Sequence, residues 1–254
     1  MFSLKEKKAV VTGAGSGIGK AVALLFARQG AQVFVVDLNE SQANEVVKEI
    51  KAAGGNASAH VADVSKQQQV VDLFTQIGQV NILVNSAGVS HIGNVETTPE
   101  GDFDRLYNVN VKGVYNCLYA AIPLMKKQGG GIILNMSSIA AIVGIPDRFA
   151  YSMTKGAVSA MTLSVARDYI KDHIRCNCIS PARVHTPFVD GFLAKNYPGK
   201  EEEMFDKLSK TQPIGRMAEP AEIAGLILYL CSGEASFITG CDYPIDGGFI
   251  KLNN

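Results

Sequence analysis

Tyr151 and Lys155 are the residues whose types and spacing point most directly to chemistry. They stand four positions apart in a segment that predicts a helix from Phe149 onward, so the phenol and the ammonium share one helix face. A cation ~4 Å away at an effective dielectric of ~20 contributes ~4 kcal/mol. That energy lowers the pKa of a tyrosine from ~10 by about three units, close to neutrality. Tyr151 is therefore a candidate general base or acid.

The same pair has a structural interpretation, in which Tyr151 is partly buried and Lys155 extends past it to water. Ser138 favours the chemical interpretation. It stands thirteen residues before Tyr151, just after the apolar run 132–136. The carboxyl end of a strand is where open parallel sheets bind ligands, so the Ser138 hydroxyl is predicted to hold a substrate oxygen beside the Tyr151 hydroxyl.

In type and spacing, Ser138, Tyr151 and Lys155 resemble the serine, tyrosine and lysine of the short-chain dehydrogenase/reductase family, in its compact single-domain branch. The resemblance extends to Asn110 in the run NVNVKG. It implies that Asn110 kinks a long helix and binds a water that links the lysine to solvent. The alternative is an interior asparagine that bonds to its own backbone.

A glycine-rich loop, TGAGSGIG, runs from Thr12 to Gly19 between a predicted strand and a predicted helix that reaches Gln29. This order makes a phosphate cradle, because glycines let the backbone approach a pyrophosphate and the helix N-terminus favours its charge. The spacing departs from G-x-G-x-x-G and resembles the T-G-x-x-x-G-x-G pattern of the short-chain family. The predicted contacts with the dinucleotide are Gly13, Ser16, Gly17, Ile18 and Gly19.

Asp37 ends the second predicted strand, some twenty residues past the glycine loop. A carboxylate at this place accepts hydrogen bonds from a ribose 2′-hydroxyl and repels a 2′-phosphate. The alternative is an ordinary turn residue. NADP-preferring members of the family typically carry Arg or Lys at the positions of Ser16 or Leu38, and this chain carries neither. The sequence therefore predicts NAD as the cofactor.

Further cofactor contacts follow from the resemblance. Asp63 matches an aspartate that binds the adenine amino group; the alternative is a helix N-cap, which Ser65 could also supply. The segment NSAG departs from N-N-A-G at Ser86, and PARVHTP has Ala182 where the family most often has glycine. The residues carried over in these segments are Asp63, Val64, Asn85, Ala87, Gly88, Pro181, Val184 and Thr186.

Strands and helices alternate along the chain, which predicts an α/β fold: a doubly wound, Rossmann-like parallel sheet of about seven strands flanked by helices. The resemblance covers residues 7–249 and no break in composition divides the 254 residues, so a single domain, 1–254, is expected. One helix is expected from Pro99 and a long one up to Lys127. A charge-rich run, 188–210, matches the family's substrate lid, expected around 186–212. The predicted strands are 8–12, 31–36, 57–61, 81–84, 132–136, 176–180 and 243–248.

Composition argues against several classes of function. Lys+Arg and Asp+Glu both number 24, so the net charge is zero and nucleic acid is not an expected partner. The apolar runs are far shorter than the ~20 residues that cross a bilayer. His60, His91, His173 and His185 form no metal-ligand spacing. The five scattered cysteines predict buried, reduced thiols in a cytoplasm, and the family resemblance implies a homotetramer.

Arg148, Arg183 and His91 are candidate substrate-binding residues. Arg148 precedes Tyr151 by three residues, and Arg183 lies in the loop predicted to contact nicotinamide. Arginine suits bidentate binding of a carboxylate, and the run DRFAYS is similar to that of 3-hydroxybutyrate-type and 2-keto-3-deoxy-L-fuconate-type dehydrogenases of the family. The alternative is that Arg148 pairs with Asp147 or another surface carboxylate, and Arg183 with the glutamates of the lid.

Together these features predict an NAD-dependent oxidoreductase that transfers a hydride between nicotinamide and a secondary alcohol or ketone, with a small hydroxy acid or sugar acid as substrate. One alternative is a dehydrogenase of a neutral, fucose-like sugar; another is an enzyme like the 3-oxoacyl reductases. A dinucleotide-binding sensor without catalysis is a further class. The complete set of Ser138, Tyr151, Lys155 and Asn110 argues against it.

Overall fold

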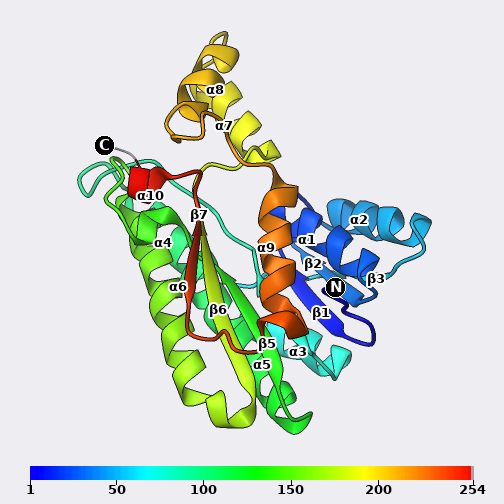
Figure 1. The fold of residues 1–254 in the computed structure, drawn as a ribbon. Coiled ribbons are helices and arrows are strands. Elements are labelled where there is room, and N and C mark those ends of the chain that lie inside the picture. The colour runs from blue at the N-terminus through cyan, green and yellow to red at the C-terminus, as the bar shows by residue number, and fades with distance from the viewer. Residues whose placement is uncertain (253–254) are drawn as a thin grey trace.

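Parallel strands form the centre of the computed structural model, which describes residues 1–252 apart from the side chains of Phe188 and Asn196. Within these residues, seven strands make one sheet in the order β3-β2-β1-β4-β5-β6-β7, and every pairing is parallel (Figure 1). This confirms the predicted fold class, with strand ends shifted by up to three residues. The strands are β1 (Lys8–Thr12), β2 (Gln32–Asp37), β3 (Asn56–Val61), β4 (Ile82–Asn85), β5 (Gly131–Met136), β6 (Ile174–Pro181) and β7 (Asp242–Ile245).

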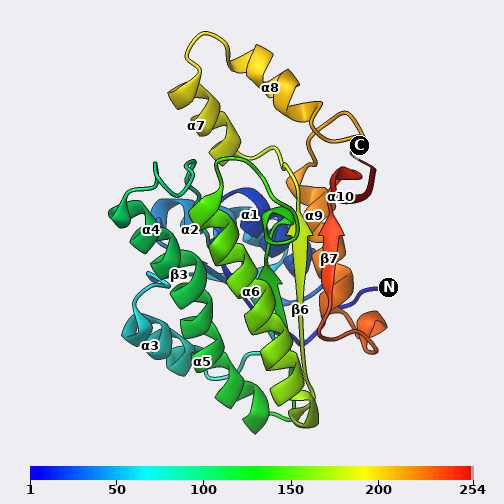
Figure 2. The ribbon, with the colours of Figure 1, turned by 90° about the vertical axis from the view of Figure 1, so that its left-hand side faces the viewer.

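Helices cover both faces of the sheet (Figures 1 and 2). Successive residues of β1 show why both faces must be covered, because Val10 and Val11 are fully buried in two separate apolar clusters. The cluster around Val11 packs against α1 (Gly17–Arg28), α2 (Glu40–Ala52) and α9 (Pro220–Cys231). The cluster around Val10 packs against α3 (Gln67–Ile77), α5 (Gly113–Lys127) and α6 (Phe149–Asp168).

The strand order reverses between β1 and β4. From β1 the chain continues to one edge through β2 and β3, and it then returns to build β4 to β7 on the other side. Loops that leave the carboxyl ends of β1 and β4 therefore diverge, and they open a crevice where doubly wound sheets bind their ligands. The glycine loop and the NSAG segment both lie at this place.

The long helix predicted up to Lys127 has three parts. α4 (Glu100–Leu106) passes into a π-helix, Tyr107–Lys112, and then into α5. A π segment inside an α-helix inserts an extra residue per turn and re-aims the side chains around it. Asn110 lies within this segment, so a local distortion is present where the resemblance implied a kink.

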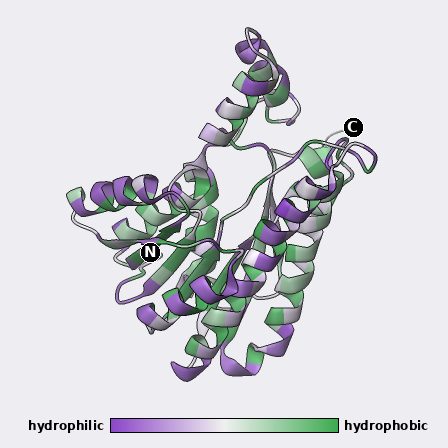
Figure 3. Cartoon of the chain, turned by 180° about the vertical axis from the view of Figure 1, so that it is seen from behind, coloured by the Kyte–Doolittle hydropathy of each residue, from purple (hydrophilic) through white to green (hydrophobic). Residues whose placement is uncertain are grey.

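The segment predicted as a lid contains two helices, α7 (Pro187–Asn196) and α8 (Glu201–Ser209). The turn between them contains Gly199 at φ +79°, a conformation that glycine adopts readily. Figures 1 to 3 show both helices standing away from the sheet, above the carboxyl ends of the strands. A short helix, α10 (Phe249–Leu252), lies near the same end of the sheet.

Hydropathy follows this architecture. Apolar residues line the strands and the inner sides of the helices, whereas the outer sides of α2 and α8 are hydrophilic (Figure 3). None of the helices in the described part of the chain combines the length and the apolar character that a membrane span requires. The five cysteines are free thiols, four of them buried, and burial raises the pKa of Cys117 and Cys231 to about 12.

Candidate active site

Tyr151 and Lys155 lie on successive turns of α6, at its N-terminal end. Lys155 is 5% exposed, and its Nζ donates a 2.7 Å hydrogen bond to the carbonyl of Met136, the last residue of β5. The same nitrogen lies 5.7 Å from the centre of the Tyr151 ring. The helix spacing therefore brings the two groups together, as the sequence predicts.

The electrostatics of this pair differ from the sequence-based argument. Burial raises the pKa of Tyr151; a hydrogen bond with Ser138 and the charge of Arg148 lower it. Burial also lowers the pKa of Lys155 to about 8. The expectation that the Lys155 ammonium is the main cause of a depressed tyrosine pKa is wrong for this structure, because the long lysine side chain reaches past the phenol to a backbone carbonyl.

Ser138 follows β5 directly, and its Oγ accepts a 3.2 Å hydrogen bond from the amide of Ala140. Ser138 and Tyr151 both line a cavity of about 270 Å³ below the lid. The two hydroxyl groups are thus positioned by different elements, a strand end and a helix, around one space. They can hold one oxygen of a ligand between them.

Asn110 fixes the loop that follows β4. Its Oδ1 accepts a hydrogen bond from the Val89 amide and its Nδ2 donates one to the Val89 carbonyl, both at 2.8 Å. The same Nδ2 donates to Thr154 Oγ1 at 3.1 Å. This buried side chain therefore ties the loop to the turn of α6 that carries Lys155, and does not bond to its own helix as the alternative supposed.

A second cavity, of about 470 Å³, lies over the switch point between β1 and β4. It meets the first cavity at Tyr151, Ile18 and Thr186, which line both. The predicted dinucleotide contacts that line it are Gly13, Ser16, Gly17, Ile18, Gly19, Asp37, Leu38, Asp63, Val64, Ala87, Gly88, Tyr151, Lys155 and Thr186.

Three predicted contacts lie elsewhere. Pro181 and Val184 line the first cavity. Asn85 is 3% exposed and donates a 2.9 Å hydrogen bond to Asn135, so its side chain braces two strand ends beneath the crevice and does not reach the cavity. The structure adds apolar wall residues that sequence reasoning missed, because an aliphatic side chain at a strand or helix end carries no distinguishing pattern. They include Val36, Ala62, Val89, Val109 and Pro187.

The glycine loop has the geometry of a cradle. Gly13 has φ +63°, and a Cβ there would lie 2.7 Å from the Cα of Ala87. A Cβ on Gly19 would collide with the Gly13 carbonyl. Ser16, the N-cap of α1, makes no side-chain capping hydrogen bond, so the first amides of the helix remain available to an anion. These residues fit the pyrophosphate of a dinucleotide.

Asp37 stands at the rim of the same cavity. Its Oδ2 accepts a 2.8 Å hydrogen bond from the Gly15 amide and its Oδ1 one of 2.9 Å from the Asn39 amide. The turn role is therefore present, and the carboxylate is fixed while each oxygen keeps a further lone pair. Asp63 likewise accepts from the Ser65 amide at 2.9 Å. Lys66 is the N-cap of α3, so the proposed capping role for Asp63 or Ser65 is wrong.

Arg148 and Arg183 enter the first cavity. Arg148 Nη1 donates to the His91 carbonyl at 3.4 Å, and Arg183 Nε donates to Thr211 Oγ1 at 3.0 Å. Burial lowers the pKa of both guanidinium groups. Neither arginine makes a salt bridge with a carboxylate among the residues that the structure describes. The charge of Asp147 still acts on Arg148 from a longer distance and raises its pKa, so that alternative holds only as a weak electrostatic contact.

His91 is placed differently from the prediction. Its Nδ1 lies 3.4 Å from Asp102 Oδ2, and it is absent from the described residues that line the substrate cavity. Its backbone carbonyl accepts from Arg148. His91 therefore contacts Arg148 through its backbone carbonyl, and its ring contacts Asp102. Within the described residues, His, Cys, Asp and Glu side chains form no group suited to a metal ion.

Comparisons with known proteins agree with this geometry. Residues 13–250 match the protein family described as enoyl-(acyl carrier protein) reductase. The chain is 40% identical to dehydrogenase/reductase SDR family member 6 of Xenopus laevis over 250 residues, covering 98% of this chain and 99% of that protein. It is 36% identical to 2-keto-3-deoxy-L-fuconate dehydrogenase of Xanthomonas campestris over 247 residues, covering 97% and 81%.

Among the solved structures with similar folds, one contains NADPH and another contains NADH. L-sorbose reductase of Gluconobacter frateurii, complexed with NADPH and L-sorbose, has a TM-score of 0.93 and 28% identity, with 98% of each chain covered. A 7α-hydroxysteroid dehydrogenase complexed with NADH and 7-oxo glycochenodeoxycholic acid has a TM-score of 0.88 and 35% identity, with 100% of this chain and 98% of that chain covered. A nicotinamide dinucleotide is thus the cofactor type of these neighbours.

Proposed function

This chain belongs to the short-chain dehydrogenase/reductase family and is an oxidoreductase that uses a nicotinamide cofactor on an alcohol or ketone, and we propose that the cofactor is NAD and the substrate a small hydroxy or keto acid. The cofactor supplies or accepts the hydride. The observation that carries the substrate proposal is a cavity with two arginines, Arg148 and Arg183, and no carboxylate among its described lining residues.

Tyr151 is the proposed acid and base. Its phenol lies in both cavities, beside Ser138, and burial keeps it protonated at neutral pH by raising its pKa. In the reductive direction the Tyr151 hydroxyl donates its proton to the ligand oxygen. In the oxidative direction the phenol proton first passes to solvent, and the resulting phenolate accepts the proton of the alcohol. The Ser138 hydroxyl donates a hydrogen bond to the same oxygen and stabilises the charge that develops there.

Lys155 is proposed to hold the positive charge beside this proton and to bind the nicotinamide ribose. A Cβ on Gly88 would lie 3.7 Å from Lys155 Nζ, so the ammonium sits against the wall of the cofactor cavity. Asn110 holds that wall through Val89. The proposed dinucleotide contacts are those that line the cavity, with Asp37 at the adenosine end.

The preference for NAD rests on Asp37 and on Leu38, which is 70% exposed and uncharged. A 2′-phosphate at this rim would face the fixed carboxylate, and neither Ser16 nor Leu38 supplies a cation to neutralise it. The neighbour complexed with NADPH shares 28% of its residues with this chain. The proposal for this chain therefore rests on its own Asp37 and not on the cofactor of that neighbour.

A neutral sugar is the second candidate substrate, because L-sorbose is the ligand of a neighbour with the same fold. The two candidates differ in charge. The purified protein is tested with NAD and a panel of hydroxy acids, their amides and parent sugars, by NADH absorbance, with Tyr151→Phe as the matched inactive control. Turnover of acids but not of amides supports the proposal; turnover of sugars alone assigns the neutral class.

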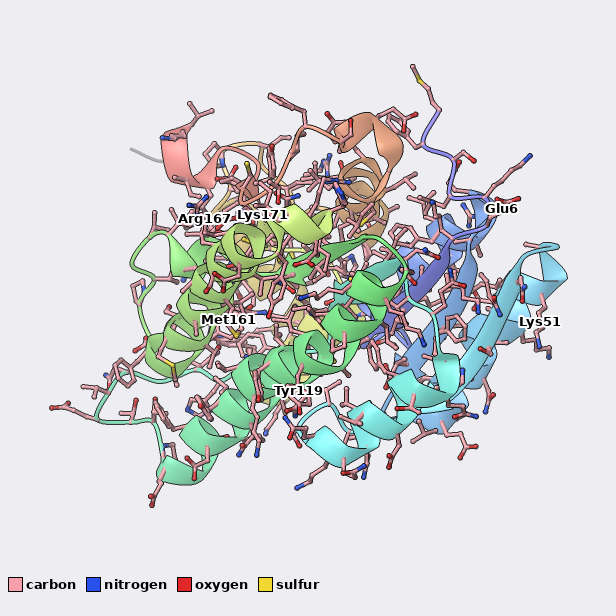
Figure 4. All side chains as sticks on the ribbon, turned by 90° about the horizontal axis from the view of Figure 1, so that it is seen from below. Glu6, Lys51, Tyr119, Met161, Arg167 and Lys171 are labelled. Carbon is pink, nitrogen blue, oxygen red and sulfur yellow. The ribbon has the colours of Figure 1, made fainter. Side chains whose placement is uncertain are left out.

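A homotetramer is proposed for the assembly. The outer faces of α5 and α6 carry exposed apolar side chains, among them Tyr119 at 55% and Leu163 at 58%; Figure 4 labels Tyr119 on α5 and Met161 on α6. The ring centres of Tyr115 and Tyr119 lie 6.0 Å apart on this surface, with the rings tilted by 44°. Sedimentation velocity tests the proposal, with Leu163→Glu as the variant expected to dissociate.

A further inference from the structure

We propose that the substrate carries two acidic groups, one bound by Arg148 and the other by Arg183, so that the enzyme acts on a hydroxy or keto dicarboxylic acid. The inference rests on the proposed function in one respect: it takes the cavity below the lid as the substrate site. It goes further by fixing the number of acidic groups and their placement on either side of the reacting carbon.

The cavity is positively charged. Two guanidinium groups line it, whereas none of its described lining residues is aspartate or glutamate. Both guanidinium groups are half-buried, and a cation partly removed from water is stabilised by an opposite charge nearby. Neither arginine forms a salt bridge among the described residues, and the one carboxylate whose charge acts on either of them there, Asp147, reaches Arg148 only from beyond salt-bridge distance. A ligand with one carboxylate leaves one of these charges unneutralised, and a ligand with two neutralises both.

The two arginines lie on different loops at the carboxyl end of the sheet. The backbone around Arg148 is docked onto the loop after β4, where the Gly93 amide donates to the Asp147 carbonyl at 2.9 Å and the Phe149 amide donates to the Gly93 carbonyl at 3.1 Å. Arg183 follows β6. Since β5 lies between β4 and β6 in the sheet, Ser138 at the end of β5 stands between the loops that hold the two cations.

Arg183 is held in place by hydrogen bonds within the protein. The Arg183 amide donates to Gln212 Oε1 at 2.9 Å, and its carbonyl accepts from the Ala218 amide at 3.0 Å. Its Nε is held by Thr211, and no described residue bonds its terminal nitrogens. Burial first and then the charge of Arg148 lower the pKa of Arg183, so the two cations feel each other. A fixed pair of repelling cations is stabilised most by an anion that spans both.

Calorimetric titration of the NAD-loaded enzyme tests the proposal. The probes are straight-chain dicarboxylates from malonate to adipate and their monoamides, which lack a hydroxyl and so bind without turnover. We expect the best-fitting diacid to bind at least tenfold more tightly than its monoamide. In Arg183→Met this advantage should fall below threefold, while the affinity for the monoamide stays within threefold. Arg183→Lys should keep part of the advantage, because it keeps the charge.

Arg167→Met is the matched control. Arg167 is exposed near the far end of α6 (Figure 4), so this substitution removes one positive charge without touching the cavity. It should leave the diacid advantage unchanged. Equal affinities for every diacid and its monoamide, absence of binding by every diacid, or equal weakening of both probes by Arg183→Met would each overturn the proposal. Failure of the proposed function looks different: diacid selectivity would persist without NAD-linked turnover of any alcohol.

Discussion

The ammonium nitrogen of Lys155 lies 5.7 Å from the centre of the Tyr151 ring, one turn further along α6. Burial lowers the pKa of the lysine to about 8 and raises that of the tyrosine. At neutral pH the lysine is therefore still largely protonated and the phenol neutral. Tyr151 lines both cavities and Lys155 only the larger one, so a proton on each group is consistent with the proposed roles of Tyr151 as proton donor and Lys155 as the charge that stabilises the resulting anion.

Tyr151→Phe should abolish turnover and leave NAD affinity nearly unchanged, because the phenol is the proposed reacting group and not a phosphate anchor. Lys155→Ala should reduce both, since the lysine also lines the cofactor cavity. Initial rates and fluorescence titration with NADH measure the two effects. Appreciable activity in Tyr151→Phe would sink the proposed mechanism.

The stability of the cofactor-free protein should depend on pH through Lys155. Its pKa falls from 10.5 to about 8 on folding, so between these values the unfolded chain binds the proton that the folded protein has lost, and stability rises with pH. From pH 7.5 to 9.5 this contribution should increase by about 2 kcal/mol. Urea unfolding of the wild type and of Lys155→Met measures it, because the variant should lack this rise; parallel curves would contradict the assignment.

The wild type should prefer NAD over NADP in kcat/KM by well over tenfold, since a phosphate beside Asp37 should cost more than ~1.4 kcal/mol. Asp37→Asn should lower this preference at least tenfold, because it removes the charge and keeps the size of the side chain. Asp72→Asn, an exposed position on α3, is the control. Comparable kcat/KM with both cofactors in the wild type would show that Asp37 serves only the turn.

Gly13→Ala should weaken NAD binding at least tenfold. Its positive φ disfavours any side chain by about 1–2 kcal/mol, and its Cβ would also press on Ala87 at 2.7 Å. Gly54→Ala separates the two causes, because Gly54 has φ +80° and a methyl group there would meet no described atom within 4 Å. Both variants should lose stability in thermal unfolding. Only Gly13→Ala should lose cofactor affinity, and equal NAD affinities would refute the cradle.

Arg148→Met should raise KM steeply for an acid substrate and spare the uncharged amide or parent sugar, because only the acid needs the guanidinium. Steady-state kinetics with an acid and its amide compare the two. Arg167→Met serves again as the charge-matched control. If Arg148→Met treats acid and amide alike, the arginine is structural and the acid assignment loses its main support.

The sequence was sufficient to predict the sheet and the crevice, and it predicted that Ser138, Tyr151 and Lys155 lie at the same end of the sheet. The family resemblance carried by Ser138, Tyr151 and Lys155 is confirmed by the comparisons. Local rules explain this success. Apolar strands that alternate with helices have few ways to pack, and a tyrosine four residues before a lysine shares its helix face whatever surrounds the helix.

Tertiary structure decided what each of these groups faces. No pattern in the chain shows that Lys155 bonds to the Met136 carbonyl, that Asn85 braces Asn135 beneath the crevice, or that His91 turns to Asp102. Asn85 and Asn135 are distant in sequence and meet because β4 and β5 pair side by side, whereas Lys155 reaches Met136 because α6 packs against β5. Burial and long-range contacts then set the pKa values of Tyr151 and Lys155 and bring Arg148 and Arg183 to the lining of one cavity, since both depend on the whole packed environment and not on local spacing.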